Sequence, residues 1–218
     1  MNSVATAFFG ACAQCAANKN CSQLIMFVFL SGNIGSGKST VLKAFEQKLG
    51  DLANRWTIVK EPSEEWAANG TLAAMYDGTL SAGEFQVMAL AARVADLVGA
   101  SNDPFVMAER SPWEDAHVFA NTTLSGIHRI NYDHARDRLM RMLPPLADQM
   151  VHIILEVDPN VAMTRIGSRA RDSEHNITPE YLSTLDDAYK TFDPPGTVHR
   201  INANGSEAAT LAAISYVL

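Results

Sequence analysis

A glycine-rich run near the start of the chain ends in lysine and serine. Residues 32–39, GNIGSGKS, fit the pattern G-x-x-x-x-G-K-[ST]. Glycines at these positions let successive backbone N–H groups turn toward phosphate oxygens, and the lysine can reach the outer phosphates. The run lies between an apolar, β-branched segment and a helical one, which is the context that the pattern requires. It therefore predicts a phosphate loop that binds a nucleoside triphosphate.

The residues expected to contact the phosphates are Gly32, Asn33, Ile34, Gly35, Ser36, Gly37, Lys38, Ser39 and Thr40. The hydroxyl of Ser39 is also a candidate ligand for Mg²⁺. GTPases, motor ATPases and small-molecule kinases share such a loop, so the loop alone does not identify the acceptor of the phosphate.

An acidic segment, EPSEEW, follows the next apolar run and begins at Glu61. A carboxylate at the end of the strand after a phosphate loop is well placed to take a proton from a hydroxyl that attacks the γ-phosphate. This position predicts Glu61 as a general base. The alternative is a solvated loop carboxylate, which is our interpretation of the neighbouring Glu64 and Glu65.

Three arginines occur within seven residues of TRIGSRARDSE, the segment 164–174, in an otherwise acidic chain: Arg165, Arg169 and Arg171. Arg165 and Arg169 share one helix face because they are four residues apart. A basic helix end of this kind fits a lid whose guanidinium groups offset charge on transferring phosphates and exclude water. A solvated helix face is the alternative interpretation.

Short apolar runs alternate with helical patterns along the chain. The predicted strands are Leu24–Leu30, Trp56–Lys60, Pro104–Ala108, Met150–Val157 and Thr197–Ile201. The predicted helices are Ser39–Leu49, Ser81–Ala100, Pro112–Phe119, Tyr132–Leu143, one from Pro159, Pro179–Thr191 and Ser206–Val217. Gly50 closes the first helix, a Ser81/Glu84 capping box opens the second, and Asp158 is the N-cap of the helix from Pro159. This alternation predicts an α/β fold with about five parallel strands flanked by helices. Ligands then bind beyond the carboxyl ends of the strands, where the motifs fall.

The bulk composition narrows the class of protein. A net charge of -7 argues against an extended face for a nucleic-acid polymer, and no apolar run reaches the length of a membrane span. We expect residues 1–22 to be a poorly ordered extension, residues 23–218 to be a single domain, and the protein to be cytoplasmic. Cys12, Cys15 and Cys21 all lie in the extension, and no context favours zinc binding or redox chemistry for them.

Six motifs in register resemble the deoxyribonucleoside kinase family. They are GNIGSGKST at 32–40, EPSEEW at 61–66, MYDG at 75–78, EFQ at 84–86, ERS at 109–111 and RARDSE at 169–174. The resemblance covers residues 24–218. It implies a P-loop kinase fold with an arginine-rich lid, a homodimer, and transfer of the γ-phosphoryl group of ATP, with Mg²⁺, to the 5′-hydroxyl of a deoxynucleoside in nucleotide salvage.

The resemblance also implies roles for individual residues. Catalytic roles fall on Glu61 as base, on Arg110, which holds the 5′-oxygen, and on Lys38, Arg169 and Arg171, while Glu109 faces Mg²⁺ beside Ser39. Arg165 joins Arg169 and Arg171 in binding ATP. Tyr76 and Glu174 would bind the sugar 3′-hydroxyl, Trp66 and Phe119 would line and stack on the base, and Gln86 would read its edge.

One helix stripe bears on the choice of base. Gln86, Ala89 and Arg93 fall on one face of the helix opened by Ser81. A small residue between an amide and a cation suits a polar planar ligand, and Asp115 can pair with Arg93 and accept a hydrogen bond from an exocyclic amine. Ala89, Arg93 and Asp115 together resemble the deoxycytidine and deoxyguanosine/deoxyadenosine kinase branch of the family.

Three other interpretations remain. The first is a thymidine or broad-specificity deoxynucleoside kinase. The second is a thymidylate-type monophosphate kinase, against which the acidic EPSEEW segment stands where a phosphate clamp would be needed. The third is a non-catalytic member of the kind used as an accessory subunit of respiratory complex I, against which Lys38, Glu61 and Arg110 are all present.

Overall fold

The computed structural model describes residues 26–49, 55–144, 150–171 and 174–217. The expected N-terminal extension with its three cysteines, and the helix-closing Gly50, lie outside these described residues.

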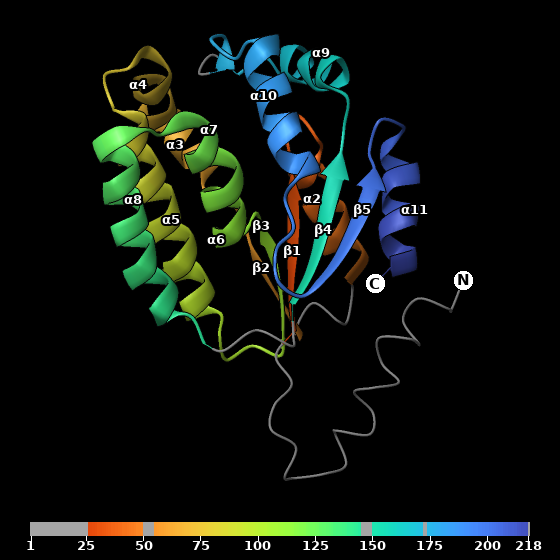
Figure 1. Cartoon of the computed structure of the whole chain (residues 1–218). Coiled ribbons are helices and arrows are strands. Elements are labelled where there is room, and N and C mark those ends of the chain that lie inside the picture. Colours follow the sequence, from red (N-terminus) through yellow and green to blue (C-terminus); the bar gives the residue numbers. More distant parts are fainter. Residues whose placement is uncertain (1–25, 50–54, 145–149, 172–173, 218) are drawn as a thin grey trace.

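The described residues contain a five-stranded parallel sheet, as the sequence predicts (Figure 1). Its order is β2-β3-β1-β4-β5. The strands are β1 (Met26–Gly32), β2 (Trp56–Val59), β3 (Phe105–Glu109), β4 (Met150–Glu156) and β5 (Thr197–Asn202). Because β1 is central and its neighbours β3 and β4 lead to opposite edges, the strand order reverses beside the end of β1. Open α/β sheets bind ligands at such a point.

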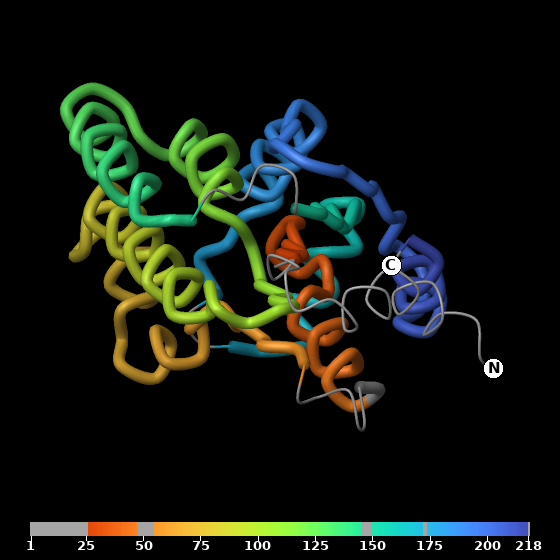
Figure 2. Tube along the Cα trace, turned by 90° about the horizontal axis from the view of Figure 1, so that it is seen from below, coloured from red at the N-terminus to blue at the C-terminus, as the bar shows by residue number. Residues whose placement is uncertain are grey.

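Helices cover both faces of the sheet. The helices α2 (Lys38–Leu49) and α11 (Glu207–Val217) pack on one face, while α5 (Ala82–Gly99) and α10 (Pro179–Lys190) lie on the other (Figure 2). Alternate side chains of β1 supply the two cores, since successive residues of a strand point to opposite faces. Val28 joins the cluster with α2 and Phe29 joins the cluster with α5, and both are fully buried.

The predicted helix starts are largely confirmed. Ser81 Oγ accepts a hydrogen bond from Glu84 N at 3.3 Å, and Glu84 Oε2 accepts one from Ser81 N at 3.1 Å, which completes the capping box of α5. The carboxylate of Asp158 caps α9 (Pro159–Arg169) by accepting from Asn160 N at 2.7 Å. These caps fix the start of the helix that carries the Gln86 stripe and of the helix that leads into the arginine segment.

Three helical regions differ from the prediction. The short helices α3 (Ser63–Ala68) and α4 (Thr71–Asp77) occupy a stretch with no predicted element. The helix α8 (Gly126–Leu139) begins at Gly126 rather than Tyr132. Its first turns contain no buried residue before Tyr132, so they lack the core-facing pattern that predicts a helix. The predicted helix Pro112–Phe119 is a turn, α6 (Pro112–Glu114), followed by a π-helix, η2 (Asp115–Ala120), and a further turn, α7 (Asn121–Thr123).

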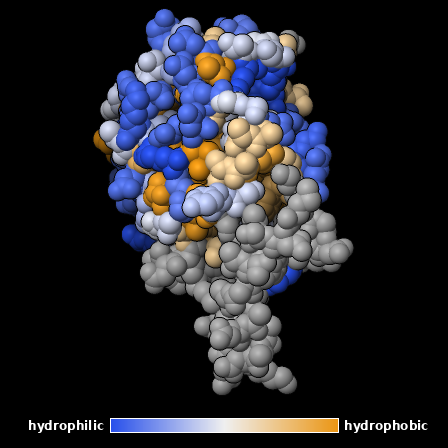
Figure 3. All heavy atoms as spheres, turned by 90° about the vertical axis from the view of Figure 1, so that its right-hand side faces the viewer, coloured by the Kyte–Doolittle hydropathy of each residue, from blue (hydrophilic) through white to orange (hydrophobic). Residues whose placement is uncertain are grey.

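The outer surface mixes hydrophobic and hydrophilic residues on the side that carries α11 (Figure 3). The large hydrophobic side chains most exposed on the described part of the chain include Ile127, Ile130 and Tyr216. No helix in that part is both long and apolar enough to cross a bilayer.

Candidate active site

A cavity opens beyond the carboxyl ends of β1, β2 and β3, between the phosphate loop and the helices α3 to α5. All ten residues predicted to contact the nucleoside line it: Glu61, Trp66, Tyr76, Gln86, Ala89, Arg93, Arg110, Asp115, Phe119 and Glu174. Ile34, Gly35, Gly37 to Thr40, Glu109, Arg169 and Arg171 line its other end. The structure thus brings together residues that lie between positions 34 and 181 of the chain.

The phosphate loop turns at three glycines whose φ angles lie in the region that side chains disfavour. Gly32, Gly35 and Gly37 have φ of 146°, 77° and 98°. A Cβ on Gly35 would also lie 2.7 Å from the carbonyl oxygen of Ala162 on α9. The sequence pattern requires glycine here because the backbone conformation, and at Gly35 the close approach of α9, leaves no room for a side chain.

Lys38 lies buried at the start of α2. Its Nζ donates to the carbonyls of Gly32 at 2.9 Å and Asn33 at 3.0 Å, so the ammonium group is held against the backbone of the phosphate loop. Burial lowers the pKa of Lys38 to about 8, and the charge of Arg110 acts in the same direction, although nearby carboxylates oppose it. An anionic phosphate ligand would favour the charged form.

Not every residue of the phosphate loop faces the cavity. The side chain of Asn33 is buried and donates through Nδ2 to the carbonyl of Leu182 on α10 at 2.9 Å. Gly32 and Ser36 are not among the lining residues. These positions shape the loop through its backbone.

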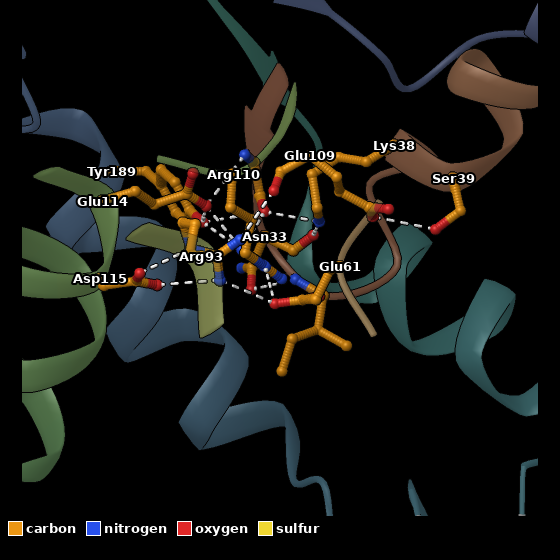
Figure 4. Close-up of polar contacts among 12 residues, drawn as sticks. Asn33, Lys38, Ser39, Glu61, Arg93, Glu109, Arg110, Glu114, Asp115 and Tyr189 are labelled. Carbon is orange, nitrogen blue, oxygen red and sulfur yellow. Dashed lines mark hydrogen bonds and ion pairs between the residues drawn. The ribbon is translucent and has the colours of Figure 1, made fainter. Parts of the chain in front are cut away.

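Glu61 lies between two arginines. Its Oε1 is 3.0 Å from Arg110 Nε and 3.2 Å from Arg93 NH2, as Figure 4 shows. Burial alone would raise the pKa of Glu61, but attraction to Arg110, Arg93 and Lys38 outweighs it and lowers the pKa to about 2. The Glu61 carboxylate is therefore ionised at neutral pH and can accept a hydrogen bond.

A hydroxyl and a carboxylate meet beside the phosphate loop. Ser39 Oγ donates to Glu109 Oε1 at 2.9 Å. Oxygen donors of these two kinds suit Mg²⁺, which binds one or two protein ligands together with phosphates and water. Among the described residues there is no group of three or more His, Cys, Asp and Glu side chains that could enclose a metal ion. The pair thus fits a metal shared with a bound nucleotide.

The far end of the cavity carries a buried ion pair. Arg93 donates through Nε to Asp115 Oδ2 at 2.6 Å and through NH2 to Asp115 Oδ1 at 3.2 Å. Burial raises the pKa of Asp115, and the charge of Arg93 pulls in the opposite direction. Contact of both oxygens with one guanidinium is the geometry of an ionised carboxylate. Gln86 and Ala89 are buried beside the pair on α5.

The π-helix places two of the predicted residues. Asp115 and Phe119 both belong to η2 and both line the cavity. The guanidinium of Arg110 lies over the ring of Phe119, 4.6 Å from its centroid. Trp66, from α3, also lines the cavity and packs edge-on against Phe85. Single π-helical turns are frequent at functional sites.

The expected sugar residues lie next to the expected lid. Glu174 contacts Arg169 through both oxygens, at 2.5 and 3.1 Å, and Arg171 through one, at 3.6 Å. Burial and the neighbouring Tyr181 and Glu174 raise the pKa of Tyr76, so its hydroxyl stays protonated. Arg169, Arg171 and Glu174 flank residues 172–173, which lie outside the described part of the chain.

Arg165 lies apart from the nucleoside cavity. It lines a second cavity with Arg169, on the other side of the phosphate loop. Its guanidinium donates to the carbonyls of Ala203 at 2.8 Å and Gly205 at 3.1 Å, and to Ser36 at 3.4 Å. Arg165 thus connects the phosphate loop to the segment between β5 and α11.

Two residues at the site had no predicted role. Glu114 is fully buried and contacts Arg110, and Tyr189 of α10 reaches the same carboxylate. The only sequence signal for Glu114 is its place beside Asp115. Tyr189 is 75 residues from Glu114 and gives no local signal.

A sequence model described as deoxynucleoside kinase matches residues 28–201. Among curated proteins, a probable deoxycytidine kinase of Fowlpox virus (strain NVSL) is 27% identical over 192 residues, covering 83% of this chain and 78% of the relative. A deoxyguanosine kinase of Dictyostelium discoideum is 31% identical over 175 residues, covering 76% of this chain but 58% of the relative.

A third relative is a thymidine kinase of Ictalurid herpesvirus 1 (strain Auburn). It is 29% identical over 184 residues, which cover 81% of this chain and 78% of the relative. The names of these three relatives include three different nucleosides, so they do not agree on a base.

Proposed function

Because the chain belongs to the deoxynucleoside kinase family, whose members are ATP-dependent phosphotransferases, we propose that it phosphorylates the 5′-hydroxyl of deoxynucleosides whose base carries an exocyclic amine. These are deoxycytidine, deoxyadenosine and deoxyguanosine, and the product would be a nucleoside monophosphate for nucleotide salvage. The observation that carries the proposal is the buried contact of Arg93 with both oxygens of Asp115 at the base end of the cavity.

An ionised Asp115 can only accept hydrogen bonds. It therefore complements an N–H donor on the base and opposes the O4 acceptor of thymine. Two acceptors facing each other in a desolvated site cost roughly 1 to 3 kcal/mol. Gln86, which has both a donor and an acceptor, can form two hydrogen bonds with the edge of a base, while Trp66 and Phe119 enclose its faces.

The 5′-hydroxyl would lie between Glu61 and Arg110 in this proposal. Glu61 accepts the hydroxyl proton and orients the oxygen toward the γ-phosphorus, and Arg110 offsets negative charge on the 5′-oxygen and the transferring group. Phosphoryl transfer passes through a loose transition state, in which positioning and electrostatics contribute most of the rate. A carboxylate held ionised by two arginines suits a positioning role of this kind.

Ser39 and Glu109 are the proposed Mg²⁺ ligands. When bound, the ion would offset the negative charge of the phosphates. Lys38 would contact the outer phosphates, and Arg165, Arg169 and Arg171 would contact ATP from the lid side. Tyr76 and Glu174 would bind the sugar 3′-hydroxyl.

The test is a comparison of kcat/KM for deoxycytidine, deoxyadenosine, deoxyguanosine and thymidine, with their ribose analogues, at saturating Mg-ATP. We expect the three amine-bearing deoxynucleosides to exceed thymidine by about ten-fold or more. Thymidine as the best substrate would reject the proposed role of the Arg93 and Asp115 pair and favour a thymidine or broad-specificity kinase, for which the Ictalurid herpesvirus relative is a precedent by its name.

Two further alternatives are less well supported. A monophosphate kinase would need basic groups for the acceptor phosphate near α3, but the first turn of that helix carries Glu64 and Glu65, and both are exposed. A non-catalytic accessory role does not require Lys38, Glu61 and Arg110 to converge on one cavity, as they do.

A homodimer is a further part of the proposal. Ile127 and Ile130 on α8 are 62% and 53% exposed, and their spacing puts both on one helix face. Burial of this face against a second copy would remove it from water. Light scattering should give the mass of a dimer, and Ile130→Glu should give a monomer.

A further inference from the structure

Glu114 holds Arg110 through a nitrogen that Glu61 does not use. Arg110 NH1 is 2.5 Å from Glu114 Oε1, whereas its Nε contacts Glu61 (Figure 4). The side chain of Glu114 has no exposed surface. The same Oε1 accepts a hydrogen bond from the hydroxyl of Tyr189 and lies 3.5 Å from the backbone N of Gly32.

The carbonyl oxygen of Gly32 joins this cluster to the phosphate loop. It accepts from Arg110 NH1 at 3.1 Å and from Lys38 Nζ at 2.9 Å, and the hydroxyl oxygen of Tyr189 lies 2.8 Å from it. Glu114 and Tyr189 therefore fix Arg110 relative to the loop that would hold the transferring phosphate. The contact joins three segments: β1 with its loop, the turn after β3, and α10.

The backbone at Arg110 is held in an uncommon conformation. Its φ of 66° lies in the left-handed region, which costs a residue with a side chain about 1 kcal/mol or more. Arg110 N donates to the carbonyl of Leu30 at 2.9 Å. Such a conformation persists only where surrounding contacts determine it. The guanidinium contacts with Glu61, Glu114 and Gly32 are among those that hold the side chain.

A packing role alone does not explain a carboxylate at this position. Taking a charge out of water is costly, and an apolar residue of similar volume often fills a buried site equally well. Glu114 instead places a negative charge against Arg110, which is one of the two arginines that contact Glu61. Glu114 and Glu61 both attract the Arg110 guanidinium, so the guanidinium is not drawn toward Glu61 alone.

We infer that Glu114 is a positioning residue for phosphoryl transfer, which together with Tyr189 aims the Arg110 guanidinium at the 5′-oxygen and ties it to the phosphate loop. The inference deepens the proposed function and rests on the role proposed there for Arg110. Glu114 does not line the cavity, so it acts through Arg110 rather than on the substrate.

The test is a double-mutant cycle between Glu114→Gln and Arg110→Lys, assayed with whichever deoxynucleoside is the best substrate. In the wild-type background, Glu114→Gln should lower kcat about ten-fold or more and change the nucleoside KM by less than about three-fold, because only the aim of Arg110 is lost. In the Arg110→Lys background, Glu114→Gln should change kcat by no more than about two-fold, since the guanidinium that it aims is already gone.

Tyr189→Phe is the second variant, because it removes only a hydroxyl and leaves the ring that packs against Phe192. It should show the same loss of kcat in the wild-type background and little loss with Arg110→Lys. Asp103→Asn is the matched control, because the Asp103 carboxylate accepts from Thr57 at 2.6 Å just before β3, at the amino end of that strand and away from the cavity. The control should keep wild-type kcat.

The outcomes separate the inference from the proposed function. Equal losses of kcat from Glu114→Gln in both backgrounds would show that Glu114 acts independently of Arg110, and would overturn the inference alone. A raised KM with unchanged kcat would overturn it as well. Wild-type kcat in Arg110→Lys would instead reject the proposed role of Arg110, and the inference with it.

Discussion

Arg169 contacts both carboxylate oxygens of Glu174, at 2.5 and 3.1 Å, so a residue expected to bind phosphates is tied to one expected to bind the sugar. Both residues line the cavity, and Arg171 approaches the same carboxylate at 3.6 Å. The 3′-hydroxyl of a bound nucleoside would compete for Glu174, and the phosphates of bound ATP would compete for Arg169. Binding of both substrates would then separate the pair.

The first prediction concerns the lid arginines. Arg169→Ala and Arg171→Ala should lower kcat more than nucleoside affinity, because their charges are needed when the phosphoryl group transfers. Steady-state kinetics with varied nucleoside, and nucleoside binding by calorimetry, measure the two effects. Arg138→Ala, at an exposed position on α8, is the control and should match the wild type. A collapse of nucleoside affinity with unchanged kcat would show that these arginines do not belong to a lid.

The second prediction concerns the proposed base. Glu61→Gln should lower kcat about 10²-fold or more while nucleoside still binds, because the amide keeps the shape but cannot accept the proton. Single-turnover rates and calorimetry check both parts. The matched change Glu65→Gln alters an exposed carboxylate of the same segment and should leave the rate as it is. Glu61 has another role if the Gln variant retains a near wild-type rate.

The third prediction is a flat acid side in the pH profile. The pKa of Glu61 is lowered to about 2, so the carboxylate is charged above that value and loses its charge only as pH falls through it. The value of kcat/KM for the nucleoside at saturating Mg-ATP should therefore not fall on acidification from about pH 8 to about pH 6. The profiles of the wild type and of Glu65→Gln should both lack an acid limb in that range. Its appearance in the wild type would mean that Glu61 is less tightly held by Arg93 and Arg110.

The fourth prediction concerns stability. His152 is fully buried on β4 and stacks on Phe29 at 4.9 Å, and burial lowers its pKa from 6.5 to about 4, although Glu114 and the backbone of Pro195 act in the opposite direction. The unfolded chain binds this proton below about pH 6.5 and the folded chain only below about pH 4. Stability is thus complete above the higher value and is lost as pH falls between the two, by up to about 3 kcal/mol.

Chemical denaturation from pH 7 to pH 4 measures this loss, with His152→Phe as the test variant. The variant keeps an aromatic ring for stacking but has no proton to bind, so its stability should depend less on pH. His134→Gln, exposed on α8, should follow the wild type. Identical pH dependence in His152→Phe and wild type would assign the acid sensitivity to other groups.

Much of the fold was predictable because the strands β1, β3 and β4 are largely buried and apolar. The caps at Ser81 and Asp158 are local side-chain signals. The helices α3 and α4 were not predictable, because helices this short are marginal on their own. Their stability comes from packing of Trp66 and Leu72 against Phe85 of α5, and a single local segment does not contain that information.

Some contacts of the candidate site could likewise be predicted from the sequence, and others could not. Lys38 and Glu61 follow strand ends, and parallel strands bring such ends to one edge, so their meeting was expected from the order of elements alone. The π-helix that carries Asp115 and the contact of Glu114 with Tyr189 depend on packing between η2 and α10. No period or short motif encodes a contact over that separation.

The last prediction concerns the base. Arg93 and Asp115 are 4% and 2% exposed, so their charges are not screened by solvent. Changing Ala89→Val, Arg93→Met and Asp115→Ala together should raise kcat/KM for thymidine relative to deoxycytidine by about ten-fold or more, because the acceptor facing O4 is removed. Asp115→Ala alone is the necessary comparison. It leaves Arg93 buried without its main partner, in contact with Glu61 at 3.2 Å. The single variant should therefore lower the turnover of every nucleoside. A triple variant with an unchanged thymidine to deoxycytidine ratio would place base selection elsewhere in the cavity, at Gln86 or the aromatic walls, while the kinase activity itself would stand.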